Sequence, residues 1–406
     1  MPDPQATPPT TQNGRPLRVG LLWHSLTSGN LGVRALTLSQ LILLEDIAKE
    51  TGISLDITIF GNRKHAYPES AFDSDVVTIA EKYVPIQIDP LIKKSLRLRQ
   101  AYREMDLVID IGEGDSFTDI YGKTRYWRQI QSRLMVLASG RPLILGPQTV
   151  GPFKPGRNEI LPRLILQRAK GSFVRDDESF DYVRTMTKKA PVQTATDLAM
   201  LLPFDPPPDQ TRARPRVGIN VSGLLYSTKT DLRDFGIHLD YRAMIHDLID
   251  AFAPLADVVI VNHVVAEPGH IDNDNDAAQA LKTRYPDLEI APDFMDPRDA
   301  KTYIATLDFF TGARMHACIG AFSSCTPLIP MAYSRKATGL FDSLGYDMVT
   351  DLTHETEGSA VVAAVLDGFH RRDQLKQRVT ESYQRAAAKL AIYRNALQAL
   401  ITEHRP

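Results

Sequence analysis

The feature that most constrains this chain is a repeated unit, in which a short apolar segment precedes a glycine-rich or polar loop and then an amphipathic helix. Residues 17–23 lead into such a loop at 24–32 and then into a helix. Residues 216–221 begin the pattern again, after a segment, 203–215, that contains five prolines. Repeated strand, loop and helix units predict parallel sheets covered by helices, so we expect two Rossmann-like domains that face each other across a cleft.

The boundaries of these parts follow the composition. Residues 1–16 are rich in proline, threonine and glutamine and are expected to be a disordered tail. We expect Rossmann-like domains at 17–202 and 216–370, with 203–215 as a Pro-rich linker. Residues 371–406 carry apolar side chains at steps of three and four, which predicts a long amphipathic helix. This α/β architecture is similar to that of GT-B glycosyltransferases, although a fold alone does not give a function.

Composition narrows the classes of function. A net charge of −2 argues against a dedicated nucleic-acid binder, and two cysteines favour a reducing, cytoplasmic location. No apolar run reaches the roughly 18 residues of a membrane span, and the N-terminus lacks the apolar core of a secretory signal. The basic residues of an expected helix at 91–104 predict a solvated face; the alternative is a surface for an anionic acceptor or for lipid headgroups at the inner membrane face. These residues are Lys93, Lys94, Arg97, Arg99 and Arg103.

Cationic residues stand where the expected strands of the second half end. Arg314 and His316 follow an apolar run at 307–310 and open a helix of small residues, and a second apolar run leads to Arg335 and Lys336. Ligands of open parallel sheets bind at the carboxyl ends of the strands, and free amides at a helix start attract anions. The pattern therefore predicts an anion site that contains a titratable histidine. The alternative for Arg314 is a structural contact with a neighbouring carbonyl or carboxylate.

The first half contributes polar residues in the same position, directly after apolar runs. The glycine loop at 29–32 is either a wall of the cleft or a tight turn. Arg175 either faces the cleft or forms an ion pair with Asp176 or Asp177. The acidic run at 272–276 is expected to be a capped, solvated helix start, because it lacks the glycine and the final glutamate of a calcium loop. The candidate binding residues of this half are Gly29, Asn30, Asp115, Ser116, Gln148 and Arg175.

Taken together, seven short motifs that run in order over residues 19–345 resemble the polysaccharide pyruvyl transferase family. One position departs from the family pattern: Val33 stands where an acidic residue is usual, and this departure concerns the acceptor side of the site. The motifs are Gly29-Asn30-x-Gly32, Gly112-Glu113-Gly114-Asp115-Ser116, Gly146-Pro147-Gln148-Thr149-Val150-Gly151-Pro152, Val174-Arg175-Asp176-Asp177-Glu178-Ser179, Asp197-Leu198-Ala199, Gly312-Ala313-Arg314-Met315-His316 and Tyr333-Ser334-Arg335-Lys336.

The resemblance implies an enzyme that moves the pyruvyl group of phosphoenolpyruvate onto a sugar of a cell-surface or exopolysaccharide precursor, free or lipid-linked. The product is a ketal, phosphate is released, and neither a cofactor nor a metal is required. The resemblance also implies donor binding by Arg175 and Arg314 and acid/base catalysis by His316. This chemistry fits the residue types, because arginine binds carboxylate and phosphate as a fork and histidine is a suitable acid near neutral pH. Arg335, Lys336 or the helix start could stabilise the leaving phosphate.

Two other classes of function stay open. The first is a nucleotide-sugar-dependent glycosyltransferase, which commonly holds a ribose with a carboxylate on a helix of the donor domain; residues 315–336 contain no Asp or Glu, which speaks against it. The second is a non-catalytic protein that binds a sugar or an anion. Such a protein would not need His316, so replacing this histidine should leave its ligand affinity largely intact.

Overall fold

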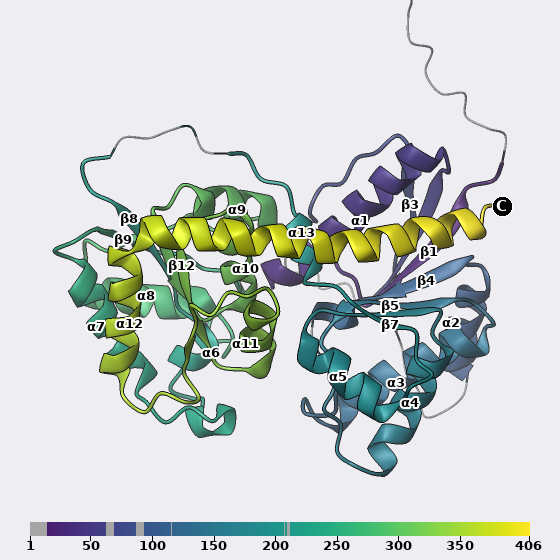
Figure 1. Ribbon diagram of the computed structural model, residues 1–406, viewed down its shortest axis with the longest axis horizontal. Coiled ribbons are helices and arrows are strands. Elements are labelled where there is room, and N and C mark those ends of the chain that lie inside the picture. The colour runs from purple at the N-terminus through teal and green to yellow at the C-terminus, as the bar shows by residue number, and fades with distance from the viewer. Residues whose placement is uncertain (1–13, 62–68, 87–92, 115, 207, 209–211) are drawn as a thin grey trace, which may run out of the picture.

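The structure is a computed structural model in which two parallel sheets, each flanked by helices, stand next to each other (Figure 1). Most of the expected N-terminal tail lies outside the described residues, as does part of the expected linker. The expected fold class is confirmed. The described residues are 14–61, 69–86, 93–114, 116–206, 208 and 212–406.

The sheet of the first half has seven strands in the order β3-β2-β1-β4-β5-β6-β7, all parallel. Helices cover both of its faces, and most residues of its central strands are buried, whichever face they point to. The strands are β1 (Leu17–Leu22), β2 (Leu55–Phe60), β3 (Val77–Val84), β4 (Leu107–Asp110), β5 (Leu143–Gln148), β6 (Gly171–Val174) and β7 (Val192–Thr194).

Two helices of this half, the first and the fifth, begin at polar side chains that cap them, Asn30 and Asp176. The side chain of Asn30 accepts a hydrogen bond from the amide of Gly32 and so starts α1, which ends at Gly52 in a left-handed conformation (φ 66°). The helices are α1 (Leu31–Thr51), α2 (Lys93–Arg103), α3 (Lys123–Ala138), α4 (Arg157–Arg168) and α5 (Asp177–Met186), with short 3₁₀ turns η1 (Gly112–Gly114) and η2 (Leu198–Leu201).

The second half repeats the arrangement with six parallel strands in the order β10-β9-β8-β11-β12-β13. The strands are β8 (Arg216–Asn220), β9 (Asp257–Ile260), β10 (Glu289–Ile290), β11 (Phe309–Gly312), β12 (Leu328–Ala332) and β13 (Thr350–Asp351). The helices are α6 (Gly223–Tyr226), η3 (Leu232–Phe235), α7 (Tyr241–Phe252), α8 (Asp274–Arg284), α9 (Pro297–Ala305), α10 (Met315–Ser323), α11 (Arg335–Asp342) and α12 (Gly358–His370).

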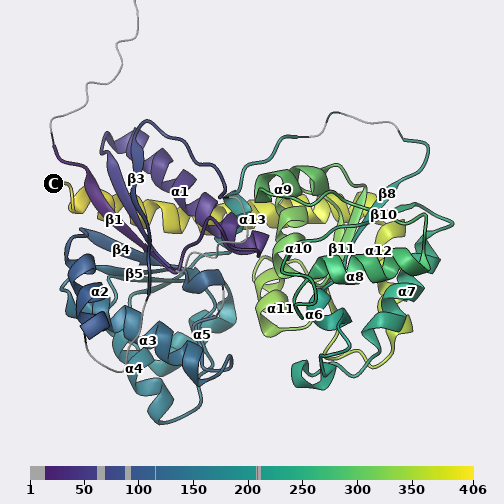
Figure 2. The same cartoon turned by 180° about the vertical axis from the view of Figure 1, so that it is seen from behind.

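One long helix, α13 (Arg372–Glu403), crosses both halves of the molecule (Figures 1 and 2). Near its start, Leu375 belongs to the apolar core of the second half. Further along, Tyr393 packs against Phe173 of β6 with 4.9 Å between ring centroids, and its hydroxyl donates to Gln40 of α1 at 2.7 Å. The helix therefore completes the apolar cores of both halves.

The two halves also meet directly, near the carboxyl ends of their strands. The amide of Leu31 donates to the carbonyl of His263 at 3.3 Å, and Nη1 of Arg34 donates to the carbonyl of Met295 at 2.5 Å. Each sheet reverses its strand order at this edge, between β1 and β4 and between β8 and β11. Ligands of open parallel sheets bind at such reversal points. We therefore expect a ligand site between the two halves.

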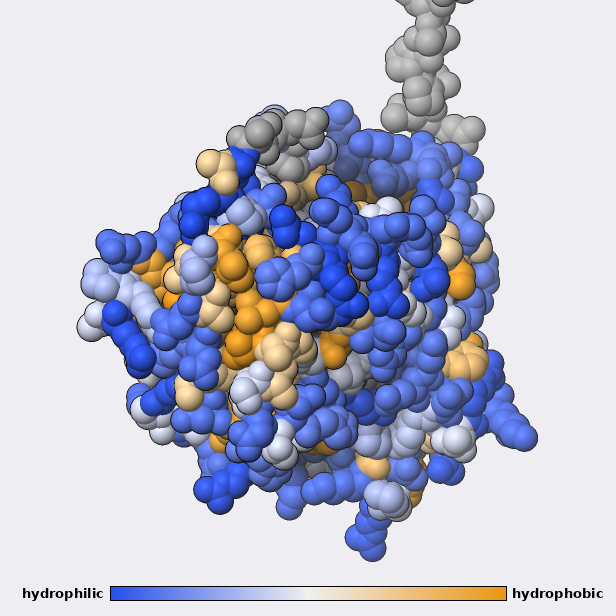
Figure 3. Space-filling model, turned by 60° about the vertical axis from the view of Figure 1, so that its left-hand side comes forward, coloured by the Kyte–Doolittle hydropathy of each residue, from blue (hydrophilic) through white to orange (hydrophobic). Residues whose placement is uncertain are grey.

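The face that comes forward when the side with α7 and α12 is turned to the viewer is mostly hydrophilic (Figure 3). It carries one larger area of apolar side chains and smaller ones toward the right of the view. Among the described residues, no helix combines the length and the apolar character that a membrane crossing requires.

Candidate active site

A cavity of about 1000 Å³ lies between the two halves, at the carboxyl ends of both sheets. The first half contributes the segments after β1, β4 and β5 to its wall, and the second half those after β8, β9, β11 and β12. Two candidates, Arg175 and Gln148, do not line it, and Asp115 lies outside the described residues. The candidates that do line it are Gly29, Asn30, Ser116, Arg314, His316, Arg335 and Lys336.

His316 occupies the first turn of α10 and presses against the first half. A Cβ atom added to Gly32 would lie 2.3 Å from Cγ and Nδ1 of the imidazole, so any other residue at this point of α1 would force a neighbouring element to shift. A Cβ atom added to Gly114 would lie 3.7 Å from Cε1. The Nε2 atom is 3.7 Å from Oδ2 of Asp197, and 11% of the His316 side chain is exposed. The glycine loop after β1 is therefore a wall of the cavity.

Asp197, at the start of η2, is the buried carboxylate that connects His316 to Arg175. Its Oδ2 atom accepts a hydrogen bond from Nη1 of Arg175 at 2.8 Å, and its Oδ1 atom accepts from the amide of Ala199 at 3.0 Å. Nε of Arg175 donates to Oγ1 of Thr149 at 2.9 Å, while Nη2 has no hydrogen-bond partner among the described residues. The ion-pair partner of Arg175 is thus Asp197 and not Asp176 or Asp177.

Arg314 is held by two carboxylates of the acidic run. Nε and Nη2 donate to Oδ1 of Asp274 at 3.1 and 2.8 Å, Nη1 donates to Oδ1 of Asp272 at 3.0 Å, and Nη2 also donates to the Asp272 carbonyl at 2.8 Å. Burial lowers the pKa of Arg314, but Asp274, Tyr333 and Asp272 outweigh it and the pKa is raised, so the guanidinium stays charged. These four bonds engage four of its five N–H groups.

Asp274 corrects the expectation of a solvated helix start at 272–276. The helix α8 does begin there, but the Asp274 side chain is fully buried. In addition to Arg314, this carboxylate accepts hydrogen bonds from the amides of Gly223 at 2.8 Å and of Val264 at 2.9 Å. It therefore fixes the loops after β8 and β9 as well as the guanidinium.

The first turn of α11 supplies two cationic side chains, Arg335 and Lys336, which make different contacts. Nη2 of Arg335 donates to the carbonyl of Gly151 at 3.1 Å and Nη1 lies 3.0 Å from Glu178, so this residue ties the two halves together. The Nζ atom of Lys336 lies 5.2 Å from the centroid of the Tyr121 ring, at the cavity wall. Among the described residues, the N-cap residues of α10 and α11, Arg314 and Ser334, form no side-chain cap, so both helices leave N–H groups for an anion at this end.

Gln148 lies behind the cavity rather than on its wall. Its Nε2 atom donates to the carbonyl of Asp110 at 3.1 Å, and its Oε1 atom accepts from Nη2 of Arg133 at 3.0 Å. Arg133 in turn forms a fully buried ion pair with Asp110. Gln148 therefore supports the loop that carries Thr149 into the cavity.

His263 and Glu113 are two of the lining residues that were not among the sequence candidates. His263 follows β9 and is 5% exposed, and neither of its ring nitrogens has a hydrogen-bond partner among the described residues. Burial, and then the nearby His316, Arg314 and Arg34, hold its pKa well below the ordinary value, so the ring is neutral at neutral pH. Its position directly after a strand was the signal that could have revealed it.

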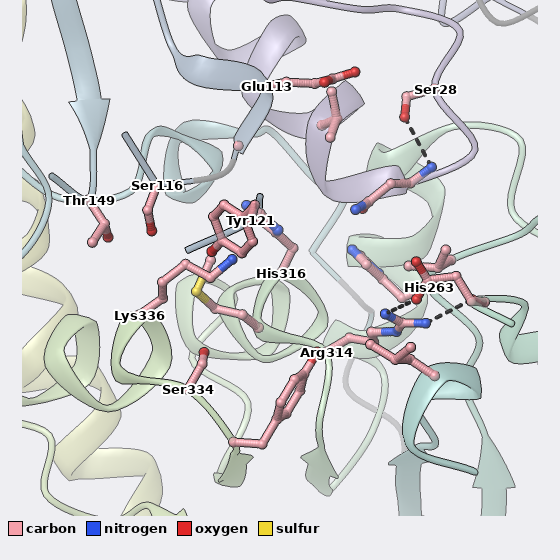
Figure 4. A pocket seen from close by; sticks show the side chains of 18 of the residues that line it. Ser28, Glu113, Ser116, Tyr121, Thr149, His263, Arg314, His316, Ser334 and Lys336 are labelled. Atoms are coloured by element: carbon pink, nitrogen blue, oxygen red, sulfur yellow. Dashed lines mark hydrogen bonds and ion pairs between the residues drawn. The ribbon is translucent and has the colours of Figure 1, made fainter. Parts of the chain in front are cut away.

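The other is Glu113, between the two glycines of η1. Its backbone is left-handed (φ 59°, ψ 30°), a conformation that costs about 1–2 kcal/mol for a residue with a Cβ atom. Its carboxylate lies 3.3 Å from Nη1 of Arg125. Figure 4 shows Glu113 and Ser28 from the first half on one side of the cavity and Arg314, with Lys336, on the side of the second half. Among the described residues, no three His, Cys, Asp or Glu side chains gather closely enough to hold a metal ion.

Solved structures with the same fold include sugar-nucleotide and sucrose-phosphate enzymes. A sucrose-phosphate synthase from Thermosynechococcus elongatus has a TM-score of 0.57 and 13% identity, covering 95% of this chain and 100% of that one. HepE of Anabaena in complex with UDP-glucose has a TM-score of 0.53 and 11% identity, covering 95% and 99%. A UDP-GlcNAc 2-epimerase from Methanocaldococcus jannaschii has a TM-score of 0.51 and 10% identity, covering 87% and 93%. At these identities the similarity establishes the fold, which is of the GT-B type.

A search of curated protein sequences finds no match to this chain. The sequence itself matches the model of the polysaccharide pyruvyl transferase family over residues 30–335, a range that contains most of the residues that line the cavity. The chain belongs to the polysaccharide pyruvyl transferase family.

Proposed function

We propose that this protein binds phosphoenolpyruvate in the cavity and transfers its pyruvyl group to a sugar as a ketal, with release of phosphate. One observation carries the proposal. The uncapped N-termini of α10 and α11 both open at the second-half wall, with His316 in the first turn of one helix and Lys336 in the first turn of the other. Two helix N-termini with a lysine suit a ligand that bears both a carboxylate and a phosphate.

The arrangement around His316 suits proton transfer to carbon. Oδ2 of Asp197 lies 3.7 Å from Nε2 of the imidazole, and the missing side chain of Gly32 leaves room for the ring against α1. Protonation of the methylene carbon of phosphoenolpyruvate would create an oxocarbenium-like centre, which a sugar hydroxyl attacks. In this scheme Arg314 and Arg175 act mainly as positioning residues, because carboxylates of the protein already engage them.

Isothermal titration calorimetry with phosphoenolpyruvate tests the donor. The wild-type protein should bind it, and Lys336→Gln should weaken binding about 10- to 100-fold, the loss expected for one charge-assisted hydrogen bond of about 1.5–3 kcal/mol. Lys376→Gln, an exposed position on α13, is the matched control and should bind like the wild type. His316→Ala should bind the donor yet release no phosphate.

The same titration separates the alternatives. A wild-type protein that binds UDP-glucose and not phosphoenolpyruvate would be a nucleotide-sugar-dependent enzyme. Binding of phosphoenolpyruvate with full phosphate release by His316→Ala would contradict the role given to the histidine. Binding of neither ligand would refute the proposed donor.

A further inference from the structure

The loop after β4 carries a strained residue that the donor chemistry leaves unused. Gly112, Glu113 and Gly114 have positive φ values of 61°, 59° and 76°, and glycine would adopt this conformation at all three positions without strain. Glu113 nonetheless occupies the middle position, and its side chain lines the cavity. A strained residue at a site is retained where its side chain has a function that outweighs the strain.

The neighbours of Glu113 include a cation and the proposed acid. The Glu113 carboxylate lies 3.3 Å from Nη1 of Arg125. A Cβ atom added to the adjacent Gly114 would lie 3.7 Å from Cε1 of His316 and 3.7 Å from Cγ2 of Val33. The loop that holds Glu113 therefore adjoins the proposed acid and the apolar side chain of Val33.

This wall differs in chemistry from the wall of the second half. Its lining includes the hydroxyls of Ser28 and Ser116, and the Tyr121 ring, which is 37% exposed, can pack against the face of a sugar. In Figure 4 Glu113 lies on the other side of His316 from Arg314. The cavity, at about 1000 Å³, leaves ample room for a sugar ring after a three-carbon phosphoester is bound.

We propose that this wall is the acceptor subsite, that it takes a neutral pyranoside with two neighbouring hydroxyls, and that Glu113 is the base for the attacking hydroxyl. The proposal rests on the proposed function. It assigns the acceptor side of the reaction to a carboxylate in the loop after β4.

The proton balance closes with these two residues. Glu113 takes the proton of the first hydroxyl as its oxygen bonds to C2 of the donor, while protonated His316 gives its proton to the methylene carbon, which becomes a methyl group. The second hydroxyl then bonds to C2 as the C2–O bond to phosphate breaks. Neutral His316 takes the proton of that second hydroxyl, and Glu113 gives its own proton to the departing phosphate. Both residues return to their starting forms.

Two substitutions at this position separate a catalytic role from a structural one. Glu113→Gln keeps the length and the strain of the residue but removes the base, and Glu113→Gly also removes the strain. Both should lower kcat by about 100-fold or more and leave the Kd for phosphoenolpyruvate unchanged. Glu113→Gly should in addition raise Tm above that of the wild type. Glu104→Gln, an exposed position after α2, is the control.

The acceptors to use are p-nitrophenyl β-glycosides of galactose, glucose, mannose and N-acetylglucosamine, with phosphate release and the mass of the ketal product as readouts. Wild-type turnover with at least one glycoside, together with a low kcat and a raised Tm in Glu113→Gly, supports the subsite. Wild-type kcat in both variants, or a Tm that falls in Glu113→Gly, overturns it. A wild-type protein that binds phosphoenolpyruvate but modifies no glycoside overturns the subsite alone, whereas one that binds no phosphoenolpyruvate overturns the proposed function.

Discussion

Replacing Gly32 by alanine would place a methyl group where the His316 imidazole now lies. The added Cβ atom would be 2.3 Å from Cγ and Nδ1 and 2.6 Å from Cβ of the histidine. Rotation about the side-chain torsions cannot relieve the last contact, because Cβ does not move with them. Either α1 or α10 must therefore shift, and each belongs to a different half of the molecule.

The size of the effect follows from two opposed terms. Overpacking at a buried contact costs about 1–3 kcal/mol, whereas alanine is favoured over glycine in a helix by about 0.5–1 kcal/mol. We expect a net loss of about 1–2 kcal/mol in the free energy of unfolding. The effect on turnover should be larger, because a displacement of about 1 Å of a catalytic group can reduce the rate about 100-fold.

Urea unfolding and phosphate release measure the two effects. Gly320→Ala is the matched control on α10, since its added Cβ atom would meet only the Ile304 side chain, at 3.6 Å. This control should be slightly stabilised and fully active. In a His316→Gly background the stability cost of Gly32→Ala should vanish, because the atoms it meets are gone. Unchanged stability and turnover in Gly32→Ala would refute the close contact between the two halves at this point.

Three further changes test the buried charges. Asp197→Asn leaves Arg175 without its counter-charge and should lower the free energy of unfolding by about 3–5 kcal/mol in urea, and a loss below about 1 kcal/mol would contradict the pairing. Burial lowers the pKa of His24 to about 3, so only the unfolded chain takes up this proton near pH 6.5. Stability should fall by about 2 kcal/mol from pH 7 to pH 5, and His24→Asn should remove this part of the fall. Burial also lowers the pKa of Lys301 to about 7, so between pH 7 and pH 9 the folded chain loses this proton while the unfolded chain keeps it. The free energy of unfolding should therefore rise by about 2 kcal/mol over this range. If the rise persists in Lys301→Met, it does not come from Lys301.

The sequence predicted the elements that bury apolar runs and missed those that do not. The central strands of both sheets lie where segments rich in apolar and β-branched residues predicted them, for example β2 (Leu55–Phe60) and β12 (Leu328–Ala332). The edge strands β7 (Val192–Thr194) and β13 (Thr350–Asp351) were not predicted. Each is only two or three residues long and partly polar, so neither has a pattern that differs from a loop.

For the site, the rule that ligands bind at the carboxyl ends of strands predicted the loops that line the cavity. It did not predict which carboxylates in these loops pair with the arginines. Arg314 and Asp274 are 40 residues apart in the sequence, and Arg175 and Asp197 are 22 apart, so no local pattern links them. The sequence also could not predict the left-handed backbone of Glu113, because backbone torsions depend on the surrounding fold. The tertiary structure alone determines which of the candidate arginines form ion pairs with carboxylates of the protein.

The helix α13 has a consequence for the order in which the protein can fold during synthesis. Tyr393, Leu397 and Ile401 belong to the same apolar core as β1 and α1. These residues leave the ribosome only after the whole second half has been made. Until then, the first half exposes the apolar surface that α13 later covers, near Phe173 and Gln40. A nascent chain of this protein should therefore be a substrate for chaperones that bind apolar surface, and a stop codon before α13 should yield insoluble protein rather than a folded fragment.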